Sequence, residues 1–359
     1  YIDWLWFESL NYQKVFVTYL FSRLGIGLAV GIFAFLFLFV NLLLTRRSVI
    51  NAARSFQFEA ESDLEEKNVF HQIPWSQNIN KRNLTTVFIV ISLIMAYLLG
   101  KAATGDWIIL QKFLNPTPFG IVEPVFQKDI GFYIFSLPFY QFLYKILMWL
   151  VVVAAFLVAV IYFLPSFITG DLQRFFKSTD VRYHLSLLVA VYFFVRAGGY
   201  QLQKYMLLYS EKGVVYGAGY ADIHASLLAY KVLVFLALLT GIVLLANIFL
   251  RRFRLVLYSV GFLIVASVAL SGVYPALVQK LRVTPNEMEL ERPYIEHNIK
   301  FTRLSYDLDK IEKKGFPAGR TLTLKDIQDN RDTVQNIRLW DHRPLQQTYS
   351  QLQEMRTYY

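Results

Sequence analysis

The segment at 291–300, ERPYIEHNIK, gathers residue types that can do chemistry: Glu291, Arg292, Glu296 and His297 lie within seven residues. Such a group can serve acid–base catalysis, bind a metal ion, or form the solvated face of a helix. On a helix, Glu296 is within reach of Arg292, four positions earlier. His297 has no second ligand at metal-like helical spacing, because the adjacent Glu296 points elsewhere. We therefore interpret the segment as structural.

Asp222 and His224 form a second candidate in GYADIHASLLAY, just before a long apolar run. An aspartate at this place commonly caps the N-terminus of the helix, here after a turn made by Gly217 and Gly219. The alternative is a proton or cation site near the exoplasmic membrane surface. GAGYAD is no dinucleotide fingerprint, because its third glycine is missing and no preceding strand is evident.

Four ionisable residues lie inside or at the ends of apolar runs: Arg23, His184, Arg196 and Lys231. A charge in the membrane is costly, but each lies within about one or two turns of a predicted helix end, so most of these side chains are expected to reach the headgroups. Arg196 precedes Gly198-Gly199, where the helix could break, and broken helices line substrate paths in transporters. Arg196, Asp222 and His224 are therefore our candidates for a polar or transport site.

Motifs for enzyme chemistry are absent from the sequence. It contains no HExxH, no GxSxG and no P-loop. Asp341-His342-Arg343 is a polar turn without an identifiable nucleophile. The lack of cysteine excludes disulfides, thiolate metal sites and cysteine catalysis. We expect no catalytic residue, cofactor or metal in this chain.

The composition predicts an all-α polytopic membrane protein. Hydrophobic residues make up 55% and charged residues 17% of the chain, against about 25% charged residues in globular domains. A run of about 20 apolar residues spans a bilayer as a helix, which satisfies its own backbone hydrogen bonds. We expect six transmembrane helices, at about 18–44, 84–102, 139–164, 183–198, 225–250 and 255–278.

Basic residues indicate the orientation. They concentrate in the loops 45–83, 165–182 and 251–254, which fall on one side if the spans alternate. The positive-inside rule makes that side cytoplasmic and the tail after residue 278 exoplasmic. The net charge is +10, of which residues 280–359 carry only +2. Because most of the excess lies beside apolar runs, we expect membrane lipids as partners, and no nucleic acid.

The exoplasmic segments are not plain linkers. Residues 105–115 and 200–212 have the pattern of short amphipathic helices lying in the membrane interface. We therefore expect the fourth span to be short and disrupted near Gly198-Gly199. Four prolines between 115 and 139 exclude a continuous helix there.

The domain organisation is predicted to be a transmembrane domain over 1–279 and the beginning of a soluble exoplasmic α or α+β domain over 280–359. Pro293 suits the first turn of a helix, and TLKD at 323–326 resembles a capping box. Pro344 lies near the start of the last helix. The chain begins with tyrosine and ends within a helical pattern, so we expect it to be cut from a longer protein.

Five segments in order resemble the Uncharacterised Protein Family 0182, large bacterial and cyanobacterial integral membrane proteins: DWLWFESLNYQKVF, NPTPFGIVEPVFQKDIGFYIFSLPF, GAGYADIHA, ERPYIEHNIKFTRLSYDL and NIRLWDHRPLQQTYSQLQEMRTYY. The resemblance implies about seven spans followed by a large exoplasmic domain. This chain would then lack the first span and most of that domain. It implies a bacterial plasma membrane or a cyanobacterial thylakoid, with a periplasmic, luminal or extracellular tail. It carries no catalytic residues onto this sequence.

Three functions remain open from the sequence. Our leading hypothesis is a non-enzymatic scaffold or assembly factor that binds other membrane or exoplasmic proteins through its exoplasmic domain. The first alternative is a transporter or channel for an ion or small solute. The second is a membrane-anchored enzyme whose site lies in the missing C-terminal part.

Overall fold

The computed structural model describes residues 2–62, 80–168, 178–250, 252–315, 319, 322–338 and 341–353. These residues form helices and connecting loops without a β-strand, apart from an isolated bridge between Val122 and Asp129. The chain divides into two compact units, Tyr1–Thr302 and Arg303–Tyr359. Each unit is described by itself.

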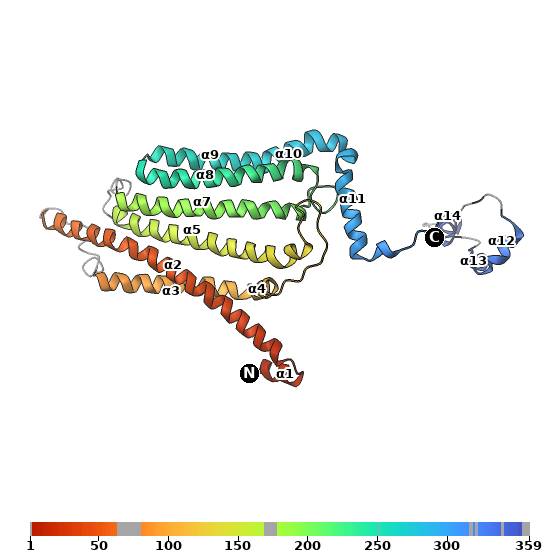
Figure 1. The fold of residues 1–359 in the computed structure, drawn as a ribbon, viewed down its shortest axis with the longest axis horizontal. Helices are drawn as coiled ribbons and strands as arrows, with labels where there is room; N and C mark the ends of the chain where they lie inside the picture. Colours follow the sequence, from red (N-terminus) through yellow and green to blue (C-terminus); the bar gives the residue numbers. More distant parts are fainter. Residues whose placement is uncertain are drawn as a thin grey trace, which may run out of the picture. The chain divides into compact units, whose positions relative to one another are not determined.

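The helices that begin in the first unit are shown in Figure 1. They are α1 Ile2–Ser9, α2 Gln13–Ser62, α3 Lys81–Ala103, α4 Trp107–Leu114, α5 Leu137–Ile168, α7 Thr179–Met206, α8 Leu227–Leu250, α9 Phe253–Val268, α10 Tyr274–Val278 and α11 Glu287–Ser305. Single π-helical turns precede α5 and α8, at Phe132–Ser136 and Asp222–Ser226.

Within the described residues, six helical stretches are long and apolar enough to cross a membrane: Gln13–Asn51, Lys81–Leu114, Phe132–Leu164, Thr179–Tyr209, Asp222–Leu250 and Arg254–Ser305. Each span expected from the sequence lies within one of them. The prediction of an all-helical protein with six candidate membrane helices is therefore confirmed.

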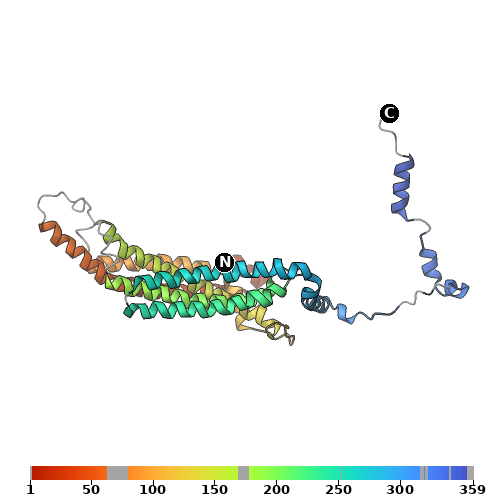
Figure 2. The ribbon, with the colours of Figure 1, turned by 90° about the horizontal axis from the view of Figure 1, so that it is seen from above.

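Neighbouring membrane helices are arranged in the order α3, α2, α5, α7, α8, α9, and the view from above shows this row to be shallow (Figure 2). The C-terminal ends of α2, α5 and α8 and the N-terminal ends of α3, α7 and α9 all lie at the same end of the helix bundle, on the left in Figure 1. The three basic loops therefore connect helices at one end. Their residues 63–79, 169–177 and 251 lie outside the described part of the chain, as do the side chains of the acidic run at 59–67.

Glycines allow α2 and α3 to cross closely. A Cβ added to Gly100 would lie 2.7 Å from the carbonyl oxygen of Gly27, and one added to Gly31 would lie 3.4 Å from the carbonyl oxygen of Ala96. Gly27 and Gly31 are four residues apart, as are Ala96 and Gly100. Small residues at this spacing let two backbones approach within a membrane, where dispersion contacts drive helix association.

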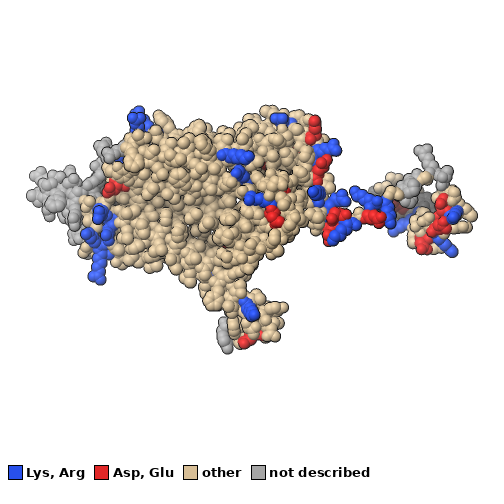
Figure 3. Space-filling model, viewed as in Figure 1, with Lys and Arg blue, Asp and Glu red and all other residues tan. Residues whose placement is uncertain are grey.

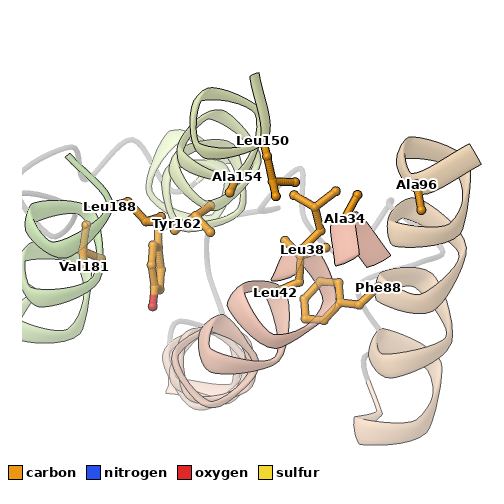
Figure 4. Packing of buried hydrophobic residues seen from close by; sticks show 11 residues of the cluster. Ala34, Leu38, Leu42, Phe88, Ala96, Leu150, Ala154, Tyr162, Val181 and Leu188 are labelled. Carbon is orange, nitrogen blue, oxygen red and sulfur yellow. The ribbon is translucent and has the colours of Figure 1, made fainter. Parts of the chain in front are cut away.

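Buried apolar side chains form two large clusters between the helices. One cluster joins α2, α3, α5 and α7 through fully buried residues such as Leu38, Phe88 and Leu150 (Figure 4). A second cluster joins α7, α8 and α9 around Leu233 and Leu244. In the space-filling view, Lys, Arg, Asp and Glu are sparse over most of the helical row (Figure 3). This surface suits contact with lipid chains.

The fourth membrane helix differs from the prediction, because α7 runs without a break from Thr179 to Met206 and passes through Gly198-Gly199. Residues 201–206 belong to the same helix, so the expected separate interfacial helix at 200–212 is wrong. The physical reason lies in packing: a Cβ on Gly199 would lie 2.5 Å from the ring of Tyr144 on α5. Gly199 therefore serves a close helix contact instead of a break. In contrast, α4 does form the short helix predicted within 105–115.

Two carboxylates organise the proline-containing loop at 115–131, which is not helical, as predicted. Glu123 is buried and accepts hydrogen bonds of 2.6–3.2 Å from three backbone N–H groups and the Tyr133 hydroxyl. Asp129 accepts from the backbone N–H groups of residues 119, 120 and 131 at 2.7–3.1 Å. These hydrogen bonds lower the pKa of Asp129 below its ordinary value, and the bond from the Phe119 N–H has the largest effect. The loop is therefore a defined structure.

Helix α11 begins at Glu287, so Pro293 lies inside it and not in its first turn. The acidic first turn, with Glu287 and Glu289, favours this earlier start through the helix dipole. The second unit contains α12 Leu324–Asp329, α13 Arg331–Asn336 and α14 His342–Gln353. The capping box predicted at TLKD is confirmed at the start of α12. Pro344 is the third residue of α14, also as expected.

Candidate functional site

A buried carboxylate from ERPYIEHNIK caps the fifth membrane helix. Glu291 on α11 is 2% exposed, and both of its carboxylate oxygens accept a hydrogen bond from the backbone N–H of Tyr220, at 3.1 Å. Tyr220 is the first residue of the helix that continues into α8. Free N–H groups and the helix dipole at such an end favour a negative charge. A Cβ on Gly219 would lie 3.0 Å from a Glu291 oxygen, so glycine makes room for the carboxylate.

Asp222 supports the same helix start from within the helix. Its carboxylate accepts a long hydrogen bond of 3.4 Å from the backbone N–H of Gly219 and one of 3.3 Å from the Ser226 hydroxyl. Gly219 is the capping residue, because its carbonyl accepts the first helical hydrogen bond, from Ile223. Asp222 is therefore the third residue of the helix, and its side chain binds the backbone N–H of the capping residue Gly219, as in a capping box. The prediction that Asp222 is itself the N-cap is wrong. Asp222 is 4% exposed.

His224 and Asp222 point in different directions. The His224 ring is exposed and stacks on the Tyr220 ring, with centroids 4.1 Å apart. The guanidinium of Arg282 lies 5.5 Å from the centroid of the same Tyr220 ring. Nearby, Asn298 of α11 donates a 2.8 Å hydrogen bond to the carbonyl of Tyr216. The segments GAGYADIHA and ERPYIEHNIK therefore form one contact region.

The remaining polar residues of ERPYIEHNIK lie at the surface. Arg292 and Glu296 form the expected ion pair four residues apart, at 3.0 Å, with both side chains exposed. His297 is also exposed. Within the described part of the chain, no group of three or more His, Asp or Glu residues could hold a metal ion. The contacts of this segment are those of a helix cap and a surface ion pair.

Among the described residues, no hydrogen bond or ion pair joins Arg196 to Asp222 or His224. Its guanidinium donates a 3.0 Å hydrogen bond to the Tyr144 hydroxyl of α5 and lies 4.4 Å from the centroid of Tyr200. Half-buried in the bundle, it is held by a phenol oxygen and an aromatic face. The three sequence candidates are therefore not assembled into a single cluster.

Sequence reasoning missed a polar cluster between three membrane helices. The His184 ring on α7 lies 3.0 Å from the amide oxygen of Asn41 on α2 and 3.3 Å from the hydroxyl of Tyr162 on α5. His184 is 8% exposed, so the expectation that it reaches the headgroups is wrong. Its ring instead finds hydrogen-bonding partners inside the bundle, which removes the cost of burying a polar group.

Comparisons with known proteins show which family the chain is similar to. The model of the uncharacterised protein family UPF0182 matches residues 1–359. Over 359 residues, the chain is 54% identical to a UPF0182 protein of Pelotomaculum thermopropionicum, covering 100% of this chain and 39% of the relative. It is 49% identical to one of Desulforamulus reducens, with the same coverage, and 40% identical to one of Moorella thermoacetica, covering 99% and 38%. No solved structure matches.

The chain therefore spans about two-fifths of the length of these curated bacterial relatives. Its candidate membrane helices lie within a match that extends over every residue of the chain. We conclude that this chain belongs to the uncharacterised protein family UPF0182.

Proposed function

We propose that this chain is the membrane part of a non-enzymatic scaffold, which holds the polypeptide beyond α11 on the exoplasmic side, where that polypeptide binds membrane or exoplasmic proteins. The observation that carries the proposal is the bond between Glu291 and the Tyr220 backbone, which ties α11 to the start of the fifth membrane helix. Helix α11 follows the sixth membrane helix, and this bond fixes Glu291 of α11 against the start of the fifth membrane helix.

The packing of the bundle supports a scaffold more than a transport path. A transporter needs ionisable groups that line a shared hydrated route across the membrane. Here the carboxylate of Asp222 is engaged by the helix start, His224 faces outward, and Arg196 contacts aromatic residues elsewhere. Two clusters of apolar side chains lie between the helices.

Transport of an ion or small solute is the second candidate, and one observation favours it. Arg196 is a half-buried cation without an ion pair among the described residues. Such a residue inside a membrane segment is a functional hypothesis by default. Catalysis by a region outside the 39% of the relatives' length that this chain matches is the third candidate.

The scaffold requires a defined orientation, with the basic loops in the cytoplasm of a bacterial cell. The chain has no native cysteine, so single variants Glu65→Cys and Lys310→Cys can be labelled with an impermeant maleimide in intact cells. We expect labelling at 310 and not at 65. Labelling at 65 alone would reverse the orientation and contradict the proposal.

Affinity purification of the full-length protein in mild detergent, followed by mass spectrometry, tests the scaffold. The same preparation is made from Arg196→Ala and Asp222→Ala variants, which are also tested for growth. A stoichiometric protein partner that is retained by both variants supports a scaffold. If no partner is recovered, and either variant loses function at normal protein levels, transport replaces it.

A further inference from the structure

The loop at 115–131 lies at the end of the helical row opposite the basic loops. It connects the C-terminal end of α4 to the π-helical turn that precedes α5. Its Phe126 ring packs against the ring of Tyr205 in the last turn of α7, with centroids 5.1 Å apart. In the view from above, the segment that leads into α5 protrudes sideways from the row (Figure 2). The loop therefore reaches the membrane boundary beside the bundle, at the level of the helix ends.

All charged side chains of this loop are engaged by the protein itself. Glu123 is 6% exposed and accepts hydrogen bonds from three backbone N–H groups and a tyrosine hydroxyl. Asp129 accepts from three other backbone N–H groups of the loop, at 2.7–3.1 Å. The ammonium group of Lys128 lies 4.5 Å from the centroid of the Phe132 ring, where a cation is attracted to the aromatic face. Residues 115–131 contain no other charged side chain.

The large side chains that the loop exposes are apolar. Phe119 is 49% exposed and Val122 is 50% exposed, and Leu114 at the end of α4 is 60% exposed. Every exposed residue between 115 and 131 is uncharged. A loop in water shows the opposite arrangement, with its charged side chains outward and its large apolar side chains covered. Apolar residues outward and charges held inward are the arrangement of a segment that faces lipid.

The loop backbone also suits a lipid boundary, where N–H groups must find their partners within the protein. The two carboxylates accept from six backbone N–H groups, three each. Ile130 donates to the carbonyl of Ile121, at 3.0 Å. The prolines at 116, 118 and 124 carry no N–H group. The loop therefore holds a fixed shape and presents few free donors to its surroundings.

We propose that Phe119 and Val122 insert into the lipid interface at this end of the bundle, which is the exoplasmic leaflet in the orientation proposed above. The partner is the boundary between phospholipid headgroups and acyl chains. Apolar side chains are stabilised there by leaving water, and the uncharged polar residues of the loop remain among the headgroups. The proposal does not depend on the scaffold function, because it rests on the exposure and charge of one loop.

The test uses fluorophores at defined positions of the full-length protein, from which any cysteine outside this chain is removed. The chain itself has no cysteine, so Phe119→Cys, Val122→Cys and the water-exposed reference Lys310→Cys can each carry a polarity-sensitive fluorophore in lipid nanodiscs. Quenching by phospholipids that are spin-labelled on the upper acyl chain is compared with quenching by aqueous iodide. Spin-labelled lipid should quench at 119 and 122 at least about twofold more strongly than at 310, and iodide should quench in the reverse order.

Two variants of equal charge give the matched control. Val122→Asp places a carboxylate on the exposed apolar part of the loop, whereas Gln127→Glu places one at an exposed polar position of the same loop. With the fluorophore at 119, Val122→Asp should weaken the quenching by spin-labelled lipid, and Gln127→Glu should leave it unchanged. Equal quenching at 119, 122 and 310 overturns the proposal, as do equal effects of the two charge variants. Protection from both quenchers at 119 and 122 also overturns it, because a protein then covers the loop.

Discussion

Substitution Glu291→Ala removes the cap that joins α11 to the fifth membrane helix. The carboxylate is 2% exposed and accepts the Tyr220 N–H through both oxygens at 3.1 Å. A hydrogen bond to a charged group contributes about 1.5–3 kcal/mol, and the alanine also leaves a space beside Gly219. We expect the free energy of unfolding to fall by about 2–4 kcal/mol. Glu291→Gln keeps an acceptor oxygen and should lose about 1 kcal/mol.

The matched control is Glu296→Ala, five residues further along the same helix. Glu296 pairs with Arg292 at the surface, and such an exposed pair contributes only about 0–1 kcal/mol. Unfolding in mixed micelles gives the three free energies, and amide hydrogen exchange locates the loss. Faster exchange should appear at 220–226 and in α11. Equal effects of Glu291→Ala and Glu296→Ala would refute the reasoning.

Three further predictions concern packing and pH. Gly199→Ala should destabilise the protein by about 1–3 kcal/mol, because the added methyl group overlaps the Tyr144 ring of α5. The control Gly198→Ala has open space around it and should be neutral or slightly stabilising, as measured by thermal unfolding of both variants. Gly100→Ala should separate α2 from α3 and lower the unfolding temperature, whereas Gly105→Ala, also in open space, should change it little. The pKa of Asp129 in the folded protein is below its ordinary value of 3.8. The ionised carboxylate therefore stabilises the loop at pH values above about 3.8, and this stabilisation is lost as the pH falls through the lower pKa of the folded protein. An NMR titration of Asp129 with a midpoint at or above pH 3.8 would contradict this.

The positions of the membrane helices follow from the sequence because the bilayer imposes a length and an apolar composition on each of them. The capping box at Thr323 and the ion pair of Arg292 with Glu296 were also predictable, since each depends on residues within one turn. Local rules apply wherever both partners are close in the chain.

The helix cap could not be predicted in the same way. Tyr220 and Glu291 are 71 residues apart, and no feature of either segment indicates that it contacts the other. The role of Gly199 depends on a tyrosine from another helix, and the same Gly-Gly pair would suit a break if that ring were absent. His184 likewise acquires its partners from α2 and α5. In each case the tertiary neighbour decides between two uses of the same residue.

Cross-linking of α11 to the segment before the fifth membrane helix tests the central claim most directly. Asn298 and Tyr216 are joined by a 2.8 Å hydrogen bond, and the chain has no cysteine of its own. The double variant Tyr216→Cys/Asn298→Cys, treated in intact membranes with a short bifunctional maleimide, should cross-link efficiently. Adding Glu291→Ala should reduce the yield strongly, whereas adding Glu296→Ala should not. If the pair does not cross-link, or if its yield is indifferent to Glu291, α11 is not held on the bundle as the structure describes.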